Sequence, residues 1–398
     1  MFSVFSPAMK TSRRTLILLT LCAATLSAQG QSPQKLRDEV QAAITRGVAF
    51  LKSQQNTEGG YWTTPQEPAL SALVLAGIVQ DPSQVGKPSA GPEVDKGYAF
   101  LLKNVQPDGG IYAKGRANYN TSISLMALVL RNRPEDEEII RKARKFVAGQ
   151  QNDYDAKGSA DNAFDGGFGY GPSKPGSPAH ADLSNTQFAL EALYLSKKLL
   201  EDTGKPVDKQ DDLNWGAAVK FIERCQNRPK SNDQKWAGDD KKNLGAFTYE
   251  PGEPGEPRGG KDAKGGPVAM RYYGSISYAG MLSFIYAGLT PDDPRVQGAL
   301  QWLGENYSVE ENPGMGAEGL FYYYHTMAKA LATAGLDQIK TKSGPVDWRT
   351  GLASHLIKLQ GADGSWKNST SGRWMESDPV LVTAYTVLAL EHVHRALK

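Results

Sequence analysis

Apolar residues recur along this chain at helical spacing rather than at strand spacing. Near the start, Ile44, Val48 and Leu51 mark one apolar stripe, whereas residues 70–78 are small and apolar on nearly every face. The first pattern is typical of a helix buried on one side, and the second of a helix buried all round. No helical segment alternates as a half-buried strand would. The pattern therefore predicts an all-α protein.

The same pair of helices returns along the whole chain, six times in all. After the first pair, the amphipathic and apolar members are expected at 94–104 and 121–130, 139–151 and 184–200, 215–226 and 276–287, 295–306 and 322–334, and 348–360 and 380–397. Six hairpins with buried second helices are best satisfied by a closed ring, with an inner and an outer ring of helices. An open solenoid is the alternative, but it needs polar terminal repeats, and neither terminal pair is polar. We therefore predict an α/α-toroid of about six helical hairpins.

A short turn motif lies between the two helices of most pairs. Its clearest copy is Gln-Gly-Ala-Asp-Gly-Ser-Trp at 360–366, and looser copies occur at 54–62, 106–112, 150–168, 225–247 and 302–316. Glycine permits the positive φ of a tight turn, and the following aromatic side chain can dock in a neighbouring pocket. Two connections are long, 153–181 and 227–267, and rich in Gly, Pro, Asp and Lys. In a ring they would surround the mouth of the central cavity, although their composition equally fits disordered surface insertions.

The first thirty residues have the composition of an export signal. Lys10, Arg13 and Arg14 precede an apolar run at 16–26, and a small-residue cleavage site ends at Gly30. The run is short for a membrane span, so we interpret 1–30 as a cleaved signal peptide without a stable membrane anchor. A single domain at 31–398 would then be exported to the periplasm or the extracellular space. Only Cys225 remains after cleavage, which excludes an internal disulfide.

The charge balance excludes one class of partner. The segment 1–30 holds three basic residues and no acidic ones, so its removal changes the formal net charge from +2 to −1. This balance leaves no basic footprint for nucleic acid. The sequence identifies no protein partner.

Candidate site residues gather where the inner helices of a ring would begin. His325 and Asp182 are the candidates for acid–base catalysis. The candidates for ligand binding at the cavity mouth are Tyr119, Asn120, Asn185, Arg271, Tyr272, Tyr273, Tyr323 and Asp378. Each has a purely structural alternative, because Asp182 and Asp378 stand at helix N-cap positions and Tyr322, Tyr323 and Tyr324 cannot all face one way.

Motifs for metals and cofactors are lacking in the sequence. The acidic stretch 153–158 has Lys157 at a calcium-ligand position, and no glycine loop for phosphate or nucleophile elbow occurs. The histidines at 355, 392 and 394 form no constellation with His325 in the sequence. We therefore expect no metal and no cofactor.

The repeated turn resembles a known motif. Residues 360–366 resemble the Gln-Trp repeat of squalene–hopene cyclases, and the hairpin array over 36–397 is similar to the α/α-toroid of terpenoid cyclases and of protein prenyltransferase β-subunits. The resemblance implies the fold. In the cyclases, an Asp-X-Asp-Asp-Thr motif supplies a proton to an alkene; the matching stretch here keeps Asp182 but has Ser184 at the proton donor and Asn185 at its partner. The prenyltransferases hold zinc with Asp, Cys and His, and only the segment around His325 resembles theirs.

Several functions stay open after this comparison. The first is an exported repeat protein of this kind that binds an apolar or isoprenoid-like ligand in an aromatic-lined central cavity and can transform it with His325 or Asp182. The second is a divergent terpenoid cyclase, an isomerase or intramolecular transferase, that uses another acid such as Glu376 or Asp378. A non-catalytic scaffold or protein-binding toroid is the third, and a carbohydrate-active toroid the fourth. Whether the chain is an enzyme is left open.

Overall fold

The computed structural model describes residues 32–85, 87, 91–153, 162–171, 180–256 and 269–397. Residues 33–398 belong to one compact unit. All helices and strands of the described residues lie in this unit. The predicted signal peptide lies outside the described residues, as do parts of the two long connections.

The described residues are mostly helical, which confirms the predicted all-α class. They form the α-helices α1 (Pro33–Ser53), α2 (Pro68–Val79), α3 (Pro92–Lys103), α4 (Ala117–Arg131), α5 (Glu137–Ala148), α6 (Leu183–Asp202), α7 (Trp215–Cys225), α8 (Gly274–Tyr286), α9 (Pro294–Glu305), α10 (Leu320–Thr333), α11 (Trp348–Leu359) and α12 (Pro379–Ala396). One antiparallel hairpin, in which β1 (Ile339–Thr341) pairs with β2 (Gly344–Val346), was not predicted from the sequence.

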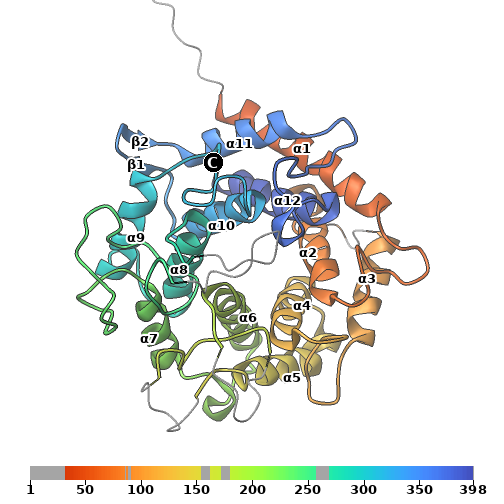
Figure 1. Ribbon diagram of the computed structural model, residues 1–398. Helices are drawn as coiled ribbons and strands as arrows, with labels where there is room; N and C mark the ends of the chain where they lie inside the picture. Colours follow the sequence, from red (N-terminus) through yellow and green to blue (C-terminus); the bar gives the residue numbers. More distant parts are fainter. Residues whose placement is uncertain are drawn as a thin grey trace, which may run out of the picture. The chain divides into compact units, whose positions relative to one another are not determined.

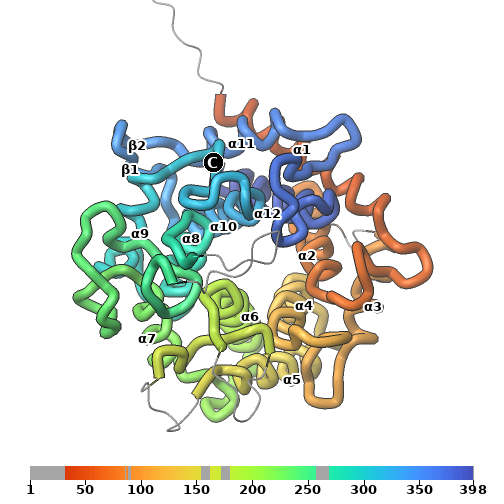
Figure 2. The backbone as a smooth tube through the Cα atoms, in the orientation of Figure 1, coloured from red at the N-terminus to blue at the C-terminus, as the bar shows by residue number. Residues whose placement is uncertain are grey.

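The even-numbered helices pack side by side in sequence order. Helix α2 packs on α4, and the order continues through α6, α8 and α10 to α12, which packs back on α2 (Figure 1). Almost every residue of α2 and α8 is buried, because these helices meet a neighbour on each side and an odd-numbered helix behind. The odd-numbered helices lie outside this set, as the backbone tube in Figure 2 shows. Helix α3 packs on α2, α5 on α4 and α9 on α8.

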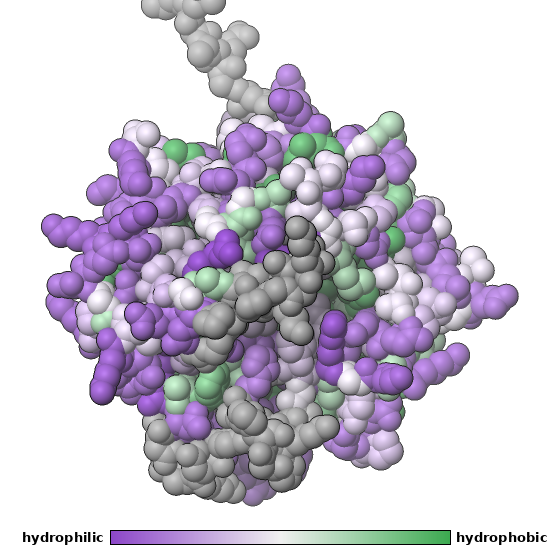
Figure 3. All heavy atoms as spheres, in the orientation of Figure 1, coloured by the Kyte–Doolittle hydropathy of each residue, from purple (hydrophilic) through white to green (hydrophobic). Residues whose placement is uncertain are grey.

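The amphipathic stripes of the odd-numbered helices explain their outer position. In α5 the apolar side chains of Ile140, Ala143 and Val147 are buried at helical spacing, while Lys142 and Lys145 stay at the surface. Arg144 is the exception, since it is buried and pairs with Asp212. Hydrophilic side chains also dominate the face seen in Figure 3, with apolar ones scattered among them. Burial of one stripe is what holds each outer helix to the inner ones.

Four of the repeated glutamines tie their unit to the next. Gln360 donates from its side-chain amide to the carbonyl of Gly364 in its own turn, at 2.9 Å, and to the carbonyl of Ala43 in α1, at 3.0 Å. Gln55, Gln151 and Gln226 bond in the same way to their own turn and to the backbone near the start of the next outer helix. Gln360 thereby links the last unit to the first, since α1 is the outer helix that follows it in space.

Five of the six repeated turns also dock on the inner helix that follows them. The backbone N–H of Trp366 donates to the Thr383 hydroxyl at 3.0 Å, and its indole N–H donates to the Leu356 carbonyl at 2.7 Å. The equivalent bonds to a buried hydroxyl run from Trp62 to Ser71, Ile111 to Thr121, Phe168 to Thr186 and Phe247 to Ser277. The repeated motif is therefore structural, and in these five units it anchors the turn to the first part of the inner helix.

Candidate functional site

Four aromatic rings from four inner helices meet near the helix starts. The ring centroids of Tyr119 in α4 and Phe188 in α6 lie 5.7 Å apart, those of Phe188 and Tyr322 in α10 lie 6.2 Å apart, and those of Tyr322 and Tyr385 in α12 lie 5.8 Å apart. Helix α8 stands between α6 and α10 in the packing order, so the contact of Phe188 with Tyr322 reaches across the interior of the helix set. We call these four residues the aromatic cluster.

One side of the aromatic cluster reaches the surface. Phe188 and Tyr385 are buried, whereas Tyr119 and Tyr322 keep part of their surface exposed. Tyr170, which is 41% exposed, lies 6.1 Å from Tyr119. A ligand could therefore approach the rings from the ends of the helices.

The phenols of the cluster are neutral at physiological pH. Burial raises the pKa of Tyr119 and of Tyr322 well above the ordinary value of 10. The Tyr322 hydroxyl lies 3.3 Å from the Ser184 hydroxyl of α6. These groups can exchange hydrogen bonds and present π faces, but they cannot act as general bases.

Asp182 caps the start of α6 beside this cluster. Its buried carboxylate accepts hydrogen bonds from the backbone N–H of Asn185 at 2.8 Å and from the Asn185 side-chain amide at 2.7 Å. The imidazole of His180 lies 3.5 Å away, and its pKa is raised, chiefly by the hydrogen bond to Asp182. Two predicted site residues are thus brought together, in an arrangement that first of all starts a helix.

His325 lies one turn deeper on α10 and is buried. Its ring stacks on Tyr385 with centroids 5.5 Å apart and lies 6.4 Å from the ring of His392, a neighbour that the sequence did not indicate. Neither ring nitrogen has a hydrogen-bond partner among the described residues. Burial lowers the pKa of His325 well below 6.5, so the imidazole is neutral and can accept a hydrogen bond from a ligand.

A buried ion pair that the sequence analysis missed lies one turn beyond His325. Lys329 of α10 donates to the carboxylate of Glu191 in α6 at 2.9 Å, and Gln187 donates to the same oxygen at 2.7 Å. Both charged side chains are at most 10% exposed. The sequence signal for this pair was that Glu191 and Lys329 each stand among apolar residues in a helix that was expected to be buried.

Two further predicted residues serve as helix-start contacts. The side-chain oxygen of Asn120 accepts from the backbone N–H of Ala69 at 3.0 Å, which joins the starts of α4 and α2. Asp378 caps α12 through the backbone N–H of Val380 at 2.8 Å and accepts from the Thr63 hydroxyl. Asp378 also lines a surface pocket of about 450 Å³, apart from the aromatic cluster.

Glu376, an acid considered for a divergent cyclase, caps α10. One oxygen of its carboxylate accepts from the backbone N–H groups of Phe321 and Tyr322, both at 2.9 Å, and the other accepts from the Asn368 amide at 2.7 Å. Burial raises the pKa of Glu376. The carboxylate is nevertheless fully engaged with donors, so it holds the turn that carries Tyr322.

The remaining predicted residues lie around α8 and α10. Tyr323, one of the predicted ligand-binding residues, has a buried hydroxyl that donates to the Ser308 carbonyl at 2.7 Å, and its ring packs on that of Tyr278. Tyr272 and Tyr273 are half-buried just before α8, and burial raises the pKa of Tyr272 to about 12. Arg271 is exposed.

Metal ligands do not cluster within the described ranges, where no group of three His, Cys, Asp or Glu side chains could hold an ion. Cys225 is a buried free thiol whose pKa is raised by burial. No helix in the described part of the chain is both long enough and apolar enough to cross a bilayer.

Comparison with known proteins rests on structure. No family model matches this sequence, and no curated protein is similar to it at the sequence level. The solved apo structure of the type II terpene cyclase MstE from Scytonema superposes with a TM-score of 0.50 at 13% identity, covering 90% of this chain and 99% of that one. The chain is similar in fold to a type II terpene cyclase. A variant of MstE in complex with its substrate, geranylgeranyl dihydroxybenzoate, gives a TM-score of 0.52 at 13% identity, with 91% and 99% covered. At this identity the similarity concerns the fold alone.

Proposed function

We propose that this chain is an α/α-toroid of six helical hairpins that binds an apolar, isoprenoid-like ligand at the aromatic cluster. The observation that carries the proposal is the meeting of four rings from α4, α6, α10 and α12, two of them partly exposed. Aromatic faces offer a large apolar contact area and stabilise positive charge. The closed packing order of the inner helices and the geranylgeranyl substrate of MstE support this assignment.

The same geometry favours binding over standard cyclisation. Ser184 stands at the position of the proton donor in the cyclase motif that residues 182–186 resemble, and a hydroxyl cannot protonate an alkene. Asp182 is engaged in capping α6 and in holding Asn185. If the ligand is transformed, the groups beside it are the neutral imidazole of His325 and the pair of Asp182 with His180. Chemistry at this site would therefore be acid–base chemistry on a functional group of the ligand.

We further propose that the protein is exported. The basic residues before the apolar run at 16–26 and the small residues at 28–30 support a cleaved signal. Expression of the full chain in a bacterium, followed by mass spectrometry of the N-terminus in the periplasmic fraction, tests this. A chain that retains residue 10 and stays in the cytoplasm would overturn the export proposal.

A non-catalytic scaffold is the second candidate, and contacts across the interior favour it. Phe188 touches Tyr322, and Glu191 pairs with Lys329, each time between helices that are separated by α8. Side chains thus fill part of the space that a ligand would need. In that case the connections between the helices would carry the protein-binding surface.

The binding test uses purified residues 31–398. Farnesol, geranylgeraniol and squalene are titrated by intrinsic fluorescence, with oleyl alcohol as an unbranched comparison, and a cell lipid extract is screened by native mass spectrometry. Tyr322→Ala is expected to lower the association constant by about tenfold or more, since it removes the central ring of the cluster. Tyr194→Ala, an exposed tyrosine further along α6, is the matched control and should bind as the wild type does.

Two outcomes decide between ligand binding and a scaffold. Retention of an isoprenoid that is weakened by Tyr322→Ala and by His325→Ala supports the proposal. Failure of every prenyl probe to bind, with no lipid retained from the extract, refutes it and leaves the scaffold.

A further inference from the structure

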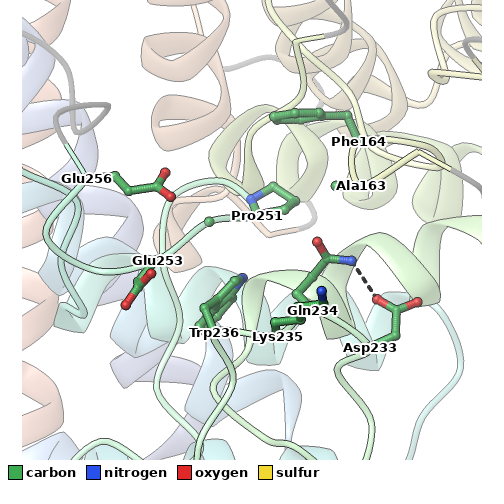
Figure 4. Close-up of a pocket in the computed structure, with 10 residues that line it drawn as sticks. Ala163, Phe164, Asp233, Gln234, Lys235, Trp236, Pro251, Glu253 and Glu256 are labelled. Carbon is green, nitrogen blue, oxygen red and sulfur yellow. Dashed lines mark hydrogen bonds between the residues drawn. The ribbon is translucent and has the colours of Figure 1, made fainter.

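A second pocket lies apart from the aromatic cluster, between two long connections. Its volume is about 560 Å³, which falls within the range of roughly 300–1,000 Å³ that small-molecule sites occupy. Its lining comes from the described parts of the α5–α6 and α7–α8 connections, and Figure 4 draws these side chains around a common space: Ala163, Phe164, Asp233, Gln234, Lys235, Trp236, Pro251, Gly252, Glu253 and Glu256.

The wall that carries Trp236 is held firmly by the protein frame. Asp233 accepts three hydrogen bonds from the nearly buried guanidinium of Arg224, at 2.9, 2.9 and 3.2 Å, and also pairs with Lys220. These cations hold the pKa of the Asp233 carboxyl well below its usual range. The Asn232 side chain donates to the carbonyl of Gln226 at 2.8 Å. A ligand would therefore meet a largely preorganised surface, which lowers the entropic cost of binding.

The pocket combines flat apolar surfaces with polar groups at its rim. Trp236 and Phe164 supply aromatic faces, and Pro251 adds a rigid apolar ring (Figure 4). Glu253 and Glu256 place carboxylates on one side. The indole N–H of Trp236 has no acceptor among the described residues, so a donor is left for a ligand oxygen.

This mixture selects one class of ligand. A hydrocarbon would leave the Glu253 carboxylate against apolar surface, at a cost in desolvation. An anion would be repelled by the same carboxylate. A simple cation would use the rings and the acids, but it offers no acceptor to Trp236 and meets Lys235 at the rim. A sugar has an apolar ring face for Trp236, hydroxyl donors for the carboxylates and an oxygen for the indole N–H.

We infer that this pocket is a binding site for a neutral saccharide, with Trp236 as its stacking platform and Glu253 as a hydroxyl acceptor. The site is independent of the proposed function, because its lining shares no residue with the aromatic cluster. The inference adds a carbohydrate ligand to a chain whose inner helices are proposed to bind an isoprenoid.

The test measures saccharide binding to purified residues 31–398. Neutral trisaccharides of glucose, N-acetylglucosamine, mannose and galactose are titrated up to about 10 mM by calorimetry and by saturation-transfer NMR, with spermidine as the amine probe. At least one trisaccharide should bind saturably. Trp236→Ala should lower its association constant by about tenfold, and Trp236→Phe, which keeps a ring but loses the N–H, by about threefold.

Two further variants separate binding from folding. Glu253→Gln changes an exposed side chain, so the fold is kept, and the association constant should fall by about threefold. Trp374→Ala changes a tryptophan that is 50% exposed and does not line this pocket, and it should bind the sugar as the wild type does. Geranylgeraniol binding should be unaffected by Glu253→Gln.

Three results would overturn the inference. The first is the absence of saturable binding for every trisaccharide. The second is unchanged affinity in both Trp236→Phe and Glu253→Gln. The third is saturable binding of spermidine with none of the sugars, which would assign the pocket to cations. Loss of isoprenoid binding alone would refute the proposed function and leave the saccharide site standing.

Discussion

The contact between the last repeated turn, residues 360–366, and helix α1 can be tested by replacing one glycine with alanine, which adds a single methyl group. Gly364 has φ +88°, and a Cβ built on it would lie 2.5 Å from the backbone oxygen of Arg46 in α1. Gly204 is the matched control, because its φ is +73° and a Cβ there meets nothing within 4 Å. Alanine at either position adopts the same unfavourable left-handed backbone, so the difference between them measures the contact alone.

The structure sets the size of the expected effect. The left-handed backbone costs alanine about 1–2 kcal/mol at both positions. At position 364 the turn must also retreat from α1, which strains the bond from Gln360 to the Ala43 carbonyl and the bond from Trp366 to Thr383. Each of these bonds contributes about 1 kcal/mol. We therefore expect Gly364→Ala to lower the free energy of unfolding by about 3–4 kcal/mol and Gly204→Ala by about 1–2 kcal/mol.

Thermal unfolding measures this difference directly. The entropy of unfolding for a chain of this length is about 0.8 kcal/mol/K, so the expected decreases in Tm are about 4–5 °C for Gly364→Ala and about 1–3 °C for Gly204→Ala. Calorimetry at a fixed scan rate and urea unfolding should agree on the order of the two variants. Equal decreases in Tm would refute the role of residues 360–366 in joining the last unit to the first.

Three buried ionisable sites can be tested by the same assay. Lys329→Met leaves the Glu191 carboxylate buried without its cationic partner, so the free energy of unfolding should fall by about 3–5 kcal/mol. Combining Lys329→Met with Glu191→Leu should recover most of the lost stability. No recovery in the double variant would contradict the pairing. Burial raises the pKa of Glu391 well above its ordinary 4.5. A carboxyl with a raised pKa in the folded state contributes stability that is fully present below about pH 4.5 and is lost as the pH rises through the folded-state pKa. Glu391→Gln should therefore raise Tm more at pH 9 than at pH 4. Glu376→Ala leaves two N–H groups of α10 unpaired and should cost about 2–4 kcal/mol, whereas Glu376→Gln keeps an acceptor and should cost less than about 1 kcal/mol.

The helical part of the fold could be predicted because its signal is local. The stripe of α1 and the all-round apolarity of α2 report directly how each helix is buried. The hairpin of β1 and β2 gave no such signal, since each strand has only three residues and β2 contains Pro345. A close approach to α9 accompanies it, because Gly304 lies against the backbone oxygen of Lys340. Contacts of this kind depend on the folded neighbours and cannot be seen in a short sequence window.

The candidate site could be predicted only as a region. Three consecutive tyrosines at 322–324 point in directions about 100° apart on a helix, so the sequence alone could not decide which one faces the interior. The structure turns Tyr322 toward Phe188 and leaves Tyr323 with Ser308. The pair of Glu191 and Lys329 was missed for a related reason, because its members lie far apart in sequence and each resembles an isolated exception in an apolar helix.

The stretch 182–186 separates structural from chemical positions within one motif. Asp182 caps α6, and the hydroxyl of Thr186 accepts from the backbone N–H of Phe168 at 3.0 Å, as the equivalent hydroxyls do in other units. Ser184 differs from both, because it is half-buried and its hydroxyl lies 3.3 Å from the Tyr322 hydroxyl, a side chain of the aromatic cluster. Thr186→Val should thus cost about 1–3 kcal/mol by leaving a buried N–H unpaired, while Ser184→Ala should cost less than about 0.5 kcal/mol in urea unfolding.

A similar loss of stability in Ser184→Ala would mean that position 184 is structural too. If instead Thr186→Val is destabilising and Ser184→Ala is not, then position 184 is the one where the side chain can change without breaking the fold. Asp182 and Thr186 therefore build the helix start, and the chemistry of the site must be judged from Ser184 and the rings around it.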